Sequence, residues 1–197
     1  MRVISGSAKG RPLKGPPGRR TRPMTDRLKT SLFNILEPYG IEGARALDLY
    51  AGSGSLGIEL LSRGAEWVDF VEQNAGVCQV IRDNLSTTKL EGRARVYNMP
   101  VERFLSMKSA AQAHMQGASD AEYDIILLDP PYADPAIPET LQSIALSPLP
   151  AEDGLVVIGH MNRLKLADEY GGGRIRRVRH RAMGDSAFSI YERDTQK

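Results

Sequence analysis

The stretch ARALDLYAGSGSLGIELLSR, residues 44–63, decides the fold, because it reads as a strand, a glycine-rich loop and a helix in direct succession. Its apolar beginning predicts a strand, and its end, SLGIELLSR, predicts a helix. Between them Gly52, Gly54 and Gly57 satisfy the G-x-G-x-x-G spacing of a nucleotide-type loop. Glycines allow a tight turn and a close backbone approach, and the following helix N-terminus presents free N–H groups. The stretch therefore predicts a binding loop at the end of the first strand of an α/β sheet.

Short apolar runs alternate with helical patterns along the rest of the chain. This order predicts a doubly wound, mostly parallel α/β sheet with helices on both faces. The last two extended runs, joined at Gly184-Asp185, predict an antiparallel hairpin. The predicted strands are 44–49, 67–72, 94–97, 124–129, 154–159, 174–181 and 187–193; the predicted helices are 55–63, 74–85, 101–113, 136–146 and a short one near 162–169.

The N-terminal part differs in composition from this alternating body. Residues 5–23 are rich in Gly, Pro and Arg, which is typical of a loop, a hairpin or a mobile arm. A helix follows, with Thr25 as its N-cap and apolar residues at helical spacing, and it ends at Pro38 and Gly40. We therefore expect a basic arm or hairpin over 1–24 and one domain over 25–197.

Positive charge is concentrated near the two ends of the chain. Residues 1–29 hold nine Lys and Arg side chains against one acid, Asp26, and the run RIRRVRHR at 174–181 holds five Arg and no acid. The remainder holds 12 basic and 23 acidic residues, so the overall charge of +2 conceals two basic segments on an acidic body. Short Arg-rich runs are often solvated surface, but dense arginine without compensating acid is what phosphate neutralisation requires. The distribution predicts a nucleic-acid partner.

The composition narrows the class of protein further. One cysteine, Cys78, excludes an internal disulfide framework and is typical of a reducing cytoplasm. That cysteine and three scattered histidines give no metal-ligand spacing, so we expect no metal. No apolar stretch approaches the roughly 18 residues of a membrane span, and the first residues lack the apolar region of a signal peptide. We expect a cytoplasmic monomer without a membrane partner.

Two acidic residues at strand ends indicate which ligand the loop holds. Asp48 lies four residues before the first glycine, and Glu72 ends the second strand. A carboxylate beside a pyrophosphate would be unfavourable, whereas it suits the ammonium and sulfonium groups of S-adenosylmethionine. Glu72 can accept hydrogen bonds from both ribose hydroxyls. The pattern favours S-adenosylmethionine over a nicotinamide dinucleotide, although a loop-bracing role stays open for Asp48.

The third strand of such a fold normally supplies an adenine contact. The stretch NMPVE at 98–102 offers Met99 and Pro100, with the backbone N–H of Val101 as a donor, while a plain core role stays open for Met99. The predicted cofactor-binding residues are Asp48, Tyr50, Ala51, Gly52, Ser53, Gly54, Gly57, Glu72, Gln73, Met99, Pro100 and Val101.

The stretch DIILLDPPY at 124–132 ends an apolar strand on a charge, two prolines and an aromatic ring. Pro130 and Pro131 fix two φ angles and remove two N–H donors, which leaves carbonyl acceptors. The Asp129 carboxylate and the Pro130 carbonyl together suit the two hydrogens of a planar NH₂ group, and Tyr132 suits stacking on its ring. Orienting such an amine towards an activated methyl group lowers the barrier by up to about 7–11 kcal/mol. We predict these four residues as catalytic, with Asp129 as a candidate base and an ordinary turn aromatic as the alternative for Tyr132.

These motifs together resemble a known enzyme family. The glycine loop followed by DPPY is similar to class I amino-methyltransferases. The blocks that resemble the RsmD-type 16S ribosomal RNA (guanine-N2)-methyltransferases are RPMTDRLKTSLFNIL (22–36), DLYAGSGSLGIELLSRGA (48–65), DPPY and MGDSAFSIYERD (183–194). The resemblance spans nearly the whole chain, and its N-terminal block is the most discriminating part.

The resemblance implies a Rossmann-like fold with a seven-stranded, mostly parallel sheet, a C-terminal antiparallel hairpin strand and an N-terminal basic arm. It also implies transfer of a methyl group from S-adenosylmethionine to the N2 amine of one guanine in 16S rRNA, within a 30S subunit or an assembly intermediate. Three residues depart from the family pattern. Thr30 stands where Glu is usual, Pro100 where Asp or Asn often contacts adenine, and Gly159 where Glu is common.

The Arg-rich ends supply the predicted RNA-binding residues, most of which should contact phosphates. They are Arg11, Arg19, Arg20, Arg22, Arg27, Arg174, Arg176, Arg177, Arg179 and Arg181. Four alternative functions stay open. The chain could be an adenine-N6 nucleic-acid methyltransferase, a protein glutamine methyltransferase, a non-catalytic RNA-binding assembly factor or a nicotinamide-dependent oxidoreductase.

Overall fold

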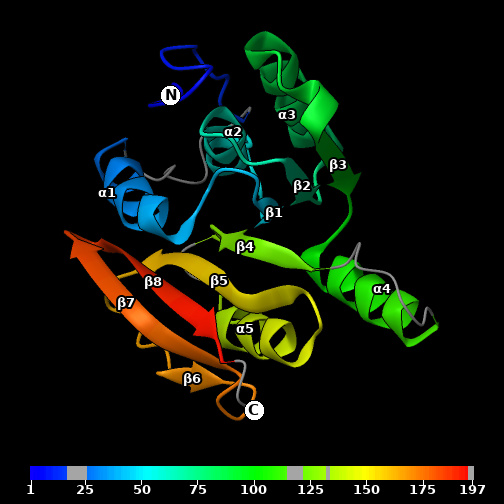
Figure 1. The fold of residues 1–197 in the computed structure, drawn as a ribbon, viewed down its shortest axis with the longest axis vertical. Coiled ribbons are helices and arrows are strands. Elements are labelled where there is room, and N and C mark those ends of the chain that lie inside the picture. Colours follow the sequence, from blue (N-terminus) through cyan, green and yellow to red (C-terminus); the bar gives the residue numbers. More distant parts are fainter. Residues whose placement is uncertain (17–25, 115–121, 132–133, 195–197) are drawn as a thin grey trace. The chain divides into compact units, whose positions relative to one another are not determined.

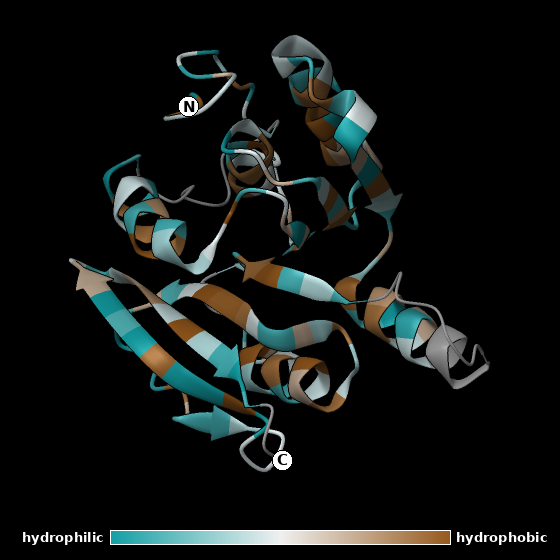
Figure 2. Cartoon of the chain, viewed as in Figure 1, coloured by the Kyte–Doolittle hydropathy of each residue, from teal (hydrophilic) through white to brown (hydrophobic). Residues whose placement is uncertain are grey.

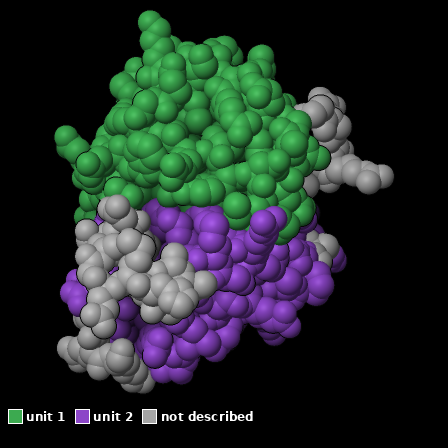
Figure 3. Space-filling model, turned by 90° about the vertical axis from the view of Figure 1, so that its right-hand side faces the viewer, with its two compact units in different colours: residues 1–100 green, residues 101–197 purple. Residues whose placement is uncertain are grey.

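A computed structural model describes residues 1–16, 26–114, 122–131 and 134–194. The chain forms two compact units, Met1–Pro100 and Val101–Lys197, which Figure 3 draws in green and purple. The predicted boundary between an arm of 1–24 and a domain of 25–197 falls outside the described residues and stays a prediction. Within the described ranges, no helix is long and apolar enough to cross a membrane.

Unit 1 contains three parallel strands in the order β3-β2-β1 (Figure 1). Residues 46–49 of β1 and 68–71 of β2 are buried, as expected for parallel strands that are covered on both faces. The unit's elements are α1 (Asp26–Leu36), η1 (Glu37–Tyr39), β1 (Arg45–Leu49), α2 (Ser55–Ser62), β2 (Trp67–Glu72), α3 (Ala75–Thr88), η2 (Glu91–Arg93) and β3 (Ala94–Asn98).

The first residues form a hairpin-like turn within unit 1. The Val3 N–H donates to the Arg11 carbonyl at 3.0 Å, and the Leu13 N–H donates to the Met1 carbonyl at 3.0 Å. The apolar side chains of Val3, Ala8 and Leu13 are buried. The described residues up to 16 thus turn back on themselves, with one isolated bridge between Arg2 and Pro12, and the choice among a loop, a hairpin and a mobile arm for 5–23 stays a prediction.

Unit 2 contains five strands in the order β4-β5-β8-β7-β6. The β4–β5 pair is parallel, and the remaining pairs are antiparallel. Figure 2 shows an apolar stretch within β5, next to hydrophilic residues of the same strand, and a largely hydrophilic β7. The unit's elements are α4 (Val101–His114), β4 (Tyr123–Leu128), α5 (Ile137–Leu146), β5 (Pro150–Met161), β6 (Glu169–Tyr170), β7 (Ile175–Met183) and β8 (Ser186–Arg193).

The helix predicted near 162–169 is wrong. The segment has no helix and leads into the short strand β6, so the described residues contain eight strands instead of seven. Its backbone groups bond elsewhere, because the Ala167 carbonyl accepts from the Tyr191 hydroxyl at 2.8 Å and the Asp168 carbonyl accepts from the Arg177 N–H at 2.8 Å. Tertiary hydrogen bonds therefore override the local helical preference.

The helix predicted over 74–85 is longer than expected. It continues through the polar Ser86-Thr87-Thr88, where the two threonine hydroxyls bond back to carbonyls of the preceding turn. Lys89, in the left-handed conformation with φ 61°, ends it. The predicted N-cap of α1, Thr25, lies outside the described residues.

Candidate active site

The glycine loop in unit 1 turns sharply between β1 and α2. Tyr50, Gly52 and Gly54 have positive φ values of 57°, 54° and 75°. A Cβ atom at Gly52 would meet nothing closer than the Tyr50 carbonyl oxygen at 3.9 Å. The backbone at Gly52 is therefore open to the approach of another group.

The third glycine of the motif has a packing role. A Cβ atom at Gly57 would lie 2.4 Å from Cε1 of Phe70 on β2. This distance is far below van der Waals contact, so only glycine lets α2 approach the strand this closely.

Asp48 is 1% exposed at the end of β1. Its Oδ2 accepts a hydrogen bond from the Gly57 N–H at 2.9 Å. The loop-bracing role that the sequence left open is therefore present, and a contact with a ligand's ammonium group stays a proposal.

Glu72 closes the other side of the loop. Its Oε2 accepts from the Gly52 N–H at 3.1 Å, and its Oε1 accepts from the Asn74 N–H at 2.8 Å. An ionised carboxylate has about four acceptor positions, so Glu72 retains capacity for ligand hydroxyl groups. Its own carbonyl accepts from the Met99 N–H at 3.1 Å, which fixes the end of β3 beside it.

The predicted adenine-contacting residues follow β3. Met99 is half-buried and Pro100 is exposed, as is Gln73 at the end of β2. Val101 is buried at the start of α4 and is the first residue of unit 2.

Asp129 follows the last residue of β4 in unit 2. Its Oδ1 is buried and has no hydrogen-bond partner within the described part of the chain. Burial raises the pKa of this carboxyl from 3.8 to about 7. Pro130 is buried and Pro131 is exposed, and the Pro131 carbonyl accepts from the Asp134 N–H at 2.9 Å. The fourth predicted catalytic residue, Tyr132, lies outside the described residues.

The predicted RNA-binding arginines fall into three groups. Arg19, Arg20 and Arg22 lie outside the described residues. Three others have internal partners, because Arg11 donates to the Thr87 carbonyl, Arg176 pairs with Glu169 and Asp194, and Arg177 pairs with Asp168. The group that is exposed and makes no ion pair with any described residue consists of Arg27, Arg174, Arg179 and Arg181.

Several buried polar residues around the loop were not predicted from the sequence. Lys29 on α1 and Glu59 on α2 form an ion pair of 3.1 Å with side chains 1% and 0% exposed. Asn84 on α3, also 1% exposed, donates to the Ser53 carbonyl of the loop at 2.9 Å. A charge inside the apolar run LGIELL was the available signal, since an unpaired carboxylate is not stable there.

The residues of unit 1 fit S-adenosylmethionine. Gly52 leaves open space along the loop, and the carboxylates of Asp48 and Glu72 border it from two adjacent strand ends. These acidic groups are suited to a cationic ligand that carries a ribose diol. Among the described residues, no cluster of His, Cys, Asp and Glu is arranged to hold a metal ion.

Comparison with known proteins shows that the chain is similar to methyltransferases. The sequence model described as Conserved hypothetical protein 95 matches residues 1–192. A Bacillus subtilis protein, YlbH, described provisionally as an rRNA methyltransferase, is 39% identical over 193 residues, covering 98% of this chain and 99% of the relative. Ribosomal RNA small subunit methyltransferase D of Escherichia coli is 31% identical, covering 100% of this chain and 91% of the relative.

A solved structure gives the same result at the level of the fold. Escherichia coli yhhF, described provisionally as a methyltransferase, matches with a TM-score of 0.79 and 31% identity. The match covers 100% of this chain and 99% of that protein.

Proposed function

Because the chain belongs to the family described as Conserved hypothetical protein 95, the RsmD-type family, and has its Rossmann-like class I methyltransferase fold, we propose that it is an S-adenosylmethionine-dependent rRNA methyltransferase. The observation that carries this proposal is Asp129, whose buried Oδ1 lacks a partner among the described residues at the end of β4. A buried acceptor without a donor is unfavourable by about 1–3 kcal/mol, and a substrate amine relieves that cost.

S-adenosylmethionine supplies an activated methyl group when it is bound. In this proposal Asp48 accepts from its ammonium group, and Glu72 accepts from its ribose hydroxyls. The open backbone at Gly52 lets the cofactor approach the loop closely. These residues bind and orient the cofactor without taking part in proton transfer.

Asp129 orients the substrate amine and accepts its proton. The Asp129 carboxylate accepts a hydrogen bond from the amine, which fixes the orientation of the nitrogen lone pair. When the amine nitrogen took up the methyl group that bound S-adenosylmethionine would supply, leaving S-adenosylhomocysteine, Asp129 Oδ1 would accept one amine proton. A pKa of about 7 suits this role near neutral pH, because the group is partly ionised and basic enough to take the proton.

We propose the N2 amine of a guanine in 16S rRNA as the acceptor, in a 30S subunit or an assembly intermediate, with the enzyme acting as a cytoplasmic monomer. This finer assignment rests on the resemblance of the whole chain to RsmD-type enzymes. Arg27, Arg174, Arg179 and Arg181 are exposed and make no ion pair with any described residue, so we propose them for phosphate contacts.

The test is transfer of a radioactive methyl group to 30S particles isolated without that modification, compared with duplex DNA, followed by mapping of the labelled base. We expect label in 16S rRNA at the N2 atom of a single guanine. The Asp129→Ala variant should bind S-adenosylhomocysteine normally and transfer no methyl group. Labelling of DNA alone, or of adenine N6, would overturn the guanine assignment, and full activity of Asp129→Ala would remove Asp129 from the mechanism.

A further inference from the structure

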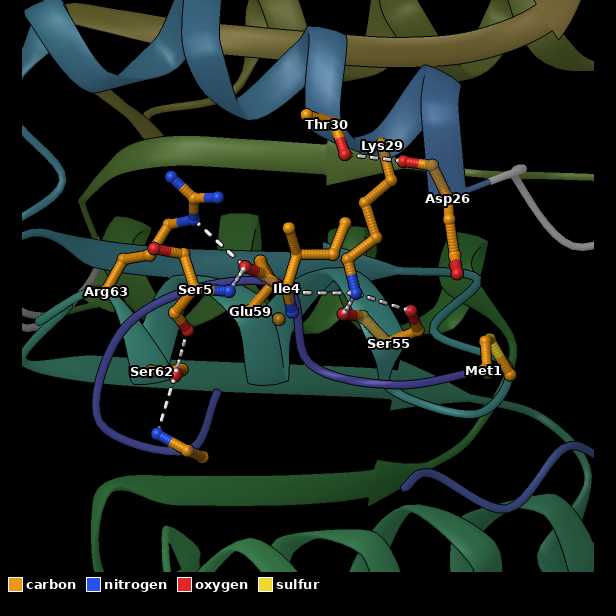
Figure 4. Close-up of polar contacts among 12 residues, drawn as sticks. Met1, Ile4, Ser5, Asp26, Lys29, Thr30, Ser55, Glu59, Ser62 and Arg63 are labelled. Carbon is orange, nitrogen blue, oxygen red and sulfur yellow. Dashed lines mark hydrogen bonds and ion pairs between the residues drawn. The ribbon is translucent and has the colours of Figure 1, made fainter. Parts of the chain in front are cut away.

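A buried carboxylate lies on the helix that follows the glycine loop. Glu59 on α2 accepts from the backbone N–H groups of Ile4 and Ser5 at 2.8 and 2.9 Å, and from Arg63 Nε at 3.0 Å. Lys29 Nζ lies 3.1 Å from its Oε2. Figure 4 shows Glu59 between residues of the N-terminal segment, α1 and α2. One side chain therefore joins three segments of unit 1.

Lys29 binds the first residue of α2, where the glycine loop ends. Its Nζ donates to the Ser55 carbonyl at 2.9 Å and to the Ser55 hydroxyl at 3.0 Å, in addition to its contact with Glu59 (Figure 4). An ammonium group has three donors, so these contacts use all of them. Ser55 is the first residue of α2 and directly follows Gly54. Lys29 is therefore saturated and buried, and it acts on the loop through Ser55 instead of contacting a ligand.

The N-terminal segment reinforces the same arrangement. The Ala8 N–H donates to the Ser62 hydroxyl at 2.9 Å, and the Ser7 N–H donates to the Ser62 carbonyl at 2.7 Å. A Cβ atom at Gly6 would lie 1.8 Å from that carbonyl oxygen. No other residue allows this approach without displacing the backbone.

The loop is also joined to this segment from its other side. Asn84 donates to the carbonyls of both Ser53 and Lys14, at 2.9 and 3.0 Å, and accepts from the Lys14 N–H at 2.8 Å. The two segments that border residues 17–25, namely 1–16 and α1, are thus both fixed to the glycine loop and its helix.

We infer that Lys29 is a positioning residue for cofactor binding, which holds the end of the glycine loop against α1 and the N-terminal segment through Ser55 and Glu59. The inference rests on the proposed function. Buried ion pairs are weak sources of stability, and a well-packed apolar pair often replaces them without loss. A saturated ammonium group at the first turn of α2 therefore has a geometric role, because it fixes the backbone that a cofactor must approach.

The substitution Lys29→Met tests this role. Methionine has a similar length and no charge, and Glu59 keeps three other donors, so we expect the variant to fold, which its far-UV circular dichroism checks. By calorimetry we expect the Kd of S-adenosylhomocysteine to rise about tenfold. The kcat at saturating cofactor should stay within about twofold of the wild type, because a positioning effect on binding alone changes KM.

Two control variants separate positioning from loss of stability. Ile144→Val changes the buried face of α5 in unit 2 and serves as a destabilised control, and Gln79→Ala breaks the exposed Gln79–Asp83 hydrogen bond of unit 1. Both should bind S-adenosylhomocysteine as the wild type does. An unchanged Kd in Lys29→Met, or an equal loss in Ile144→Val, would overturn the inference.

Hydrogen exchange on the wild-type protein gives an independent readout. We expect S-adenosylhomocysteine to slow exchange of the Ile4 and Ser5 amides, which donate to Glu59, and of amides in α1. If the ligand binds and protects the glycine loop but not these amides, the inference fails while the proposed function stands. If the ligand does not bind, the proposed function and the inference fail together.

Discussion

The proton affinity of Asp129 is set by the residues that bury it. Its carboxyl is an ordinary aspartate in composition, but burial removes water from Oδ1 and raises the pKa to about 7. The preceding residues of β4, 125–128, are all buried, so Asp129 directly follows a strand that lies in the core. A group that changes charge near neutral pH makes activity sensitive to pH.

We expect kcat/KM to rise with pH and to reach half of its maximum near pH 7, because the ionised form of Asp129 accepts the amine proton. Methyl-transfer rates between pH 5.5 and 8.5 measure this. The profile should be absent from Asp129→Asn, whose residual rate should not depend on pH. A wild-type profile that is flat across this range would contradict the assignment.

The same pKa affects stability in the opposite sense. Because the folded-state pKa is raised, the native protein binds this proton more tightly than the unfolded chain does. The stabilising contribution of Asp129 is complete below about pH 4 and is lost as the pH rises to about 7. Asp129→Asn should therefore gain stability relative to the wild type at pH 8 and not at pH 4, as measured by urea unfolding. An equal effect at both pH values would contradict a raised pKa.

Gly57→Ala should destabilise unit 1 by about 1–3 kcal/mol, because the added methyl group would overlap the Phe70 ring. Urea unfolding measures the difference. The matched control is Gly92→Ala, where a Cβ atom would have nothing within 4 Å. Equal stability of the two variants would show that α2 can move away from β2 without cost.

At the scale of the element, the arginines of β7 form two groups that we expect to have different roles. Side chains two residues apart on an antiparallel strand lie on one face, about 6.8 Å from each other. Arg179 and Arg181 form such a pair, and both are exposed and make no ion pair with any described residue. Arg176 and Arg177 lie earlier in the same strand. They form ion pairs with Glu169, Asp194 and Asp168. The first pair is therefore available to phosphates and the second stabilises the hairpin.

We expect Arg179→Ala/Arg181→Ala to weaken RNA binding and to reduce the slope of log K against log salt by about 1–2, since each lost phosphate contact contributes about 0.7–0.9. Arg176→Ala/Arg177→Ala is the matched control and should mainly lower the melting temperature. RNA affinity measured at several salt concentrations distinguishes the two. The same salt slope in both double variants would contradict the division.

Elements with a strong apolar pattern could be predicted from the sequence. The second strand was predicted as 67–72 and is Trp67–Glu72, and the C-terminal hairpin turns at Gly184-Asp185 as expected. The helix near 162–169 was wrong because hydrogen bonds from Tyr191 and Arg177 decide its conformation. Those partners come from distant strands, and no local pattern contains them.

The positions of the glycines and Asp48 in the fold could also be predicted from local sequence patterns. Their hydrogen-bond and ion-pair partners could not. The glycines and Asp48 follow from the strand–loop–helix order. The bond from the Gly57 N–H to Asp48 was foreseen only as an alternative, and the Lys29–Glu59 pair was not foreseen. The pair depends on how α1 packs against α2, which the spacing of apolar residues alone does not specify.

At the scale of the whole molecule, cofactor binding and stability should be linked. A ligand at about 100 times its Kd stabilises a protein by about 2.7 kcal/mol, which corresponds to roughly 5–10 °C in melting temperature for a chain of this size. We expect such a rise with S-adenosylhomocysteine and none with NAD, measured by thermal unfolding. Stabilisation by NAD instead would favour a nicotinamide-dependent oxidoreductase.

Arg11 and Thr87, which are joined by a hydrogen bond, lie 76 positions apart in the chain. During synthesis this bond can therefore form only after Thr87 has been added. At about 5–20 residues per second, a ribosome needs roughly 4–15 seconds to proceed from the first position to the second. During that interval the hairpin-like segment can dock on α2, through its bonds to Glu59 and Ser62. Its bonds to Asn84 and Thr87 form only after α3 has emerged, and the glycine loop acquires its final support, from Asn84, in the same late step.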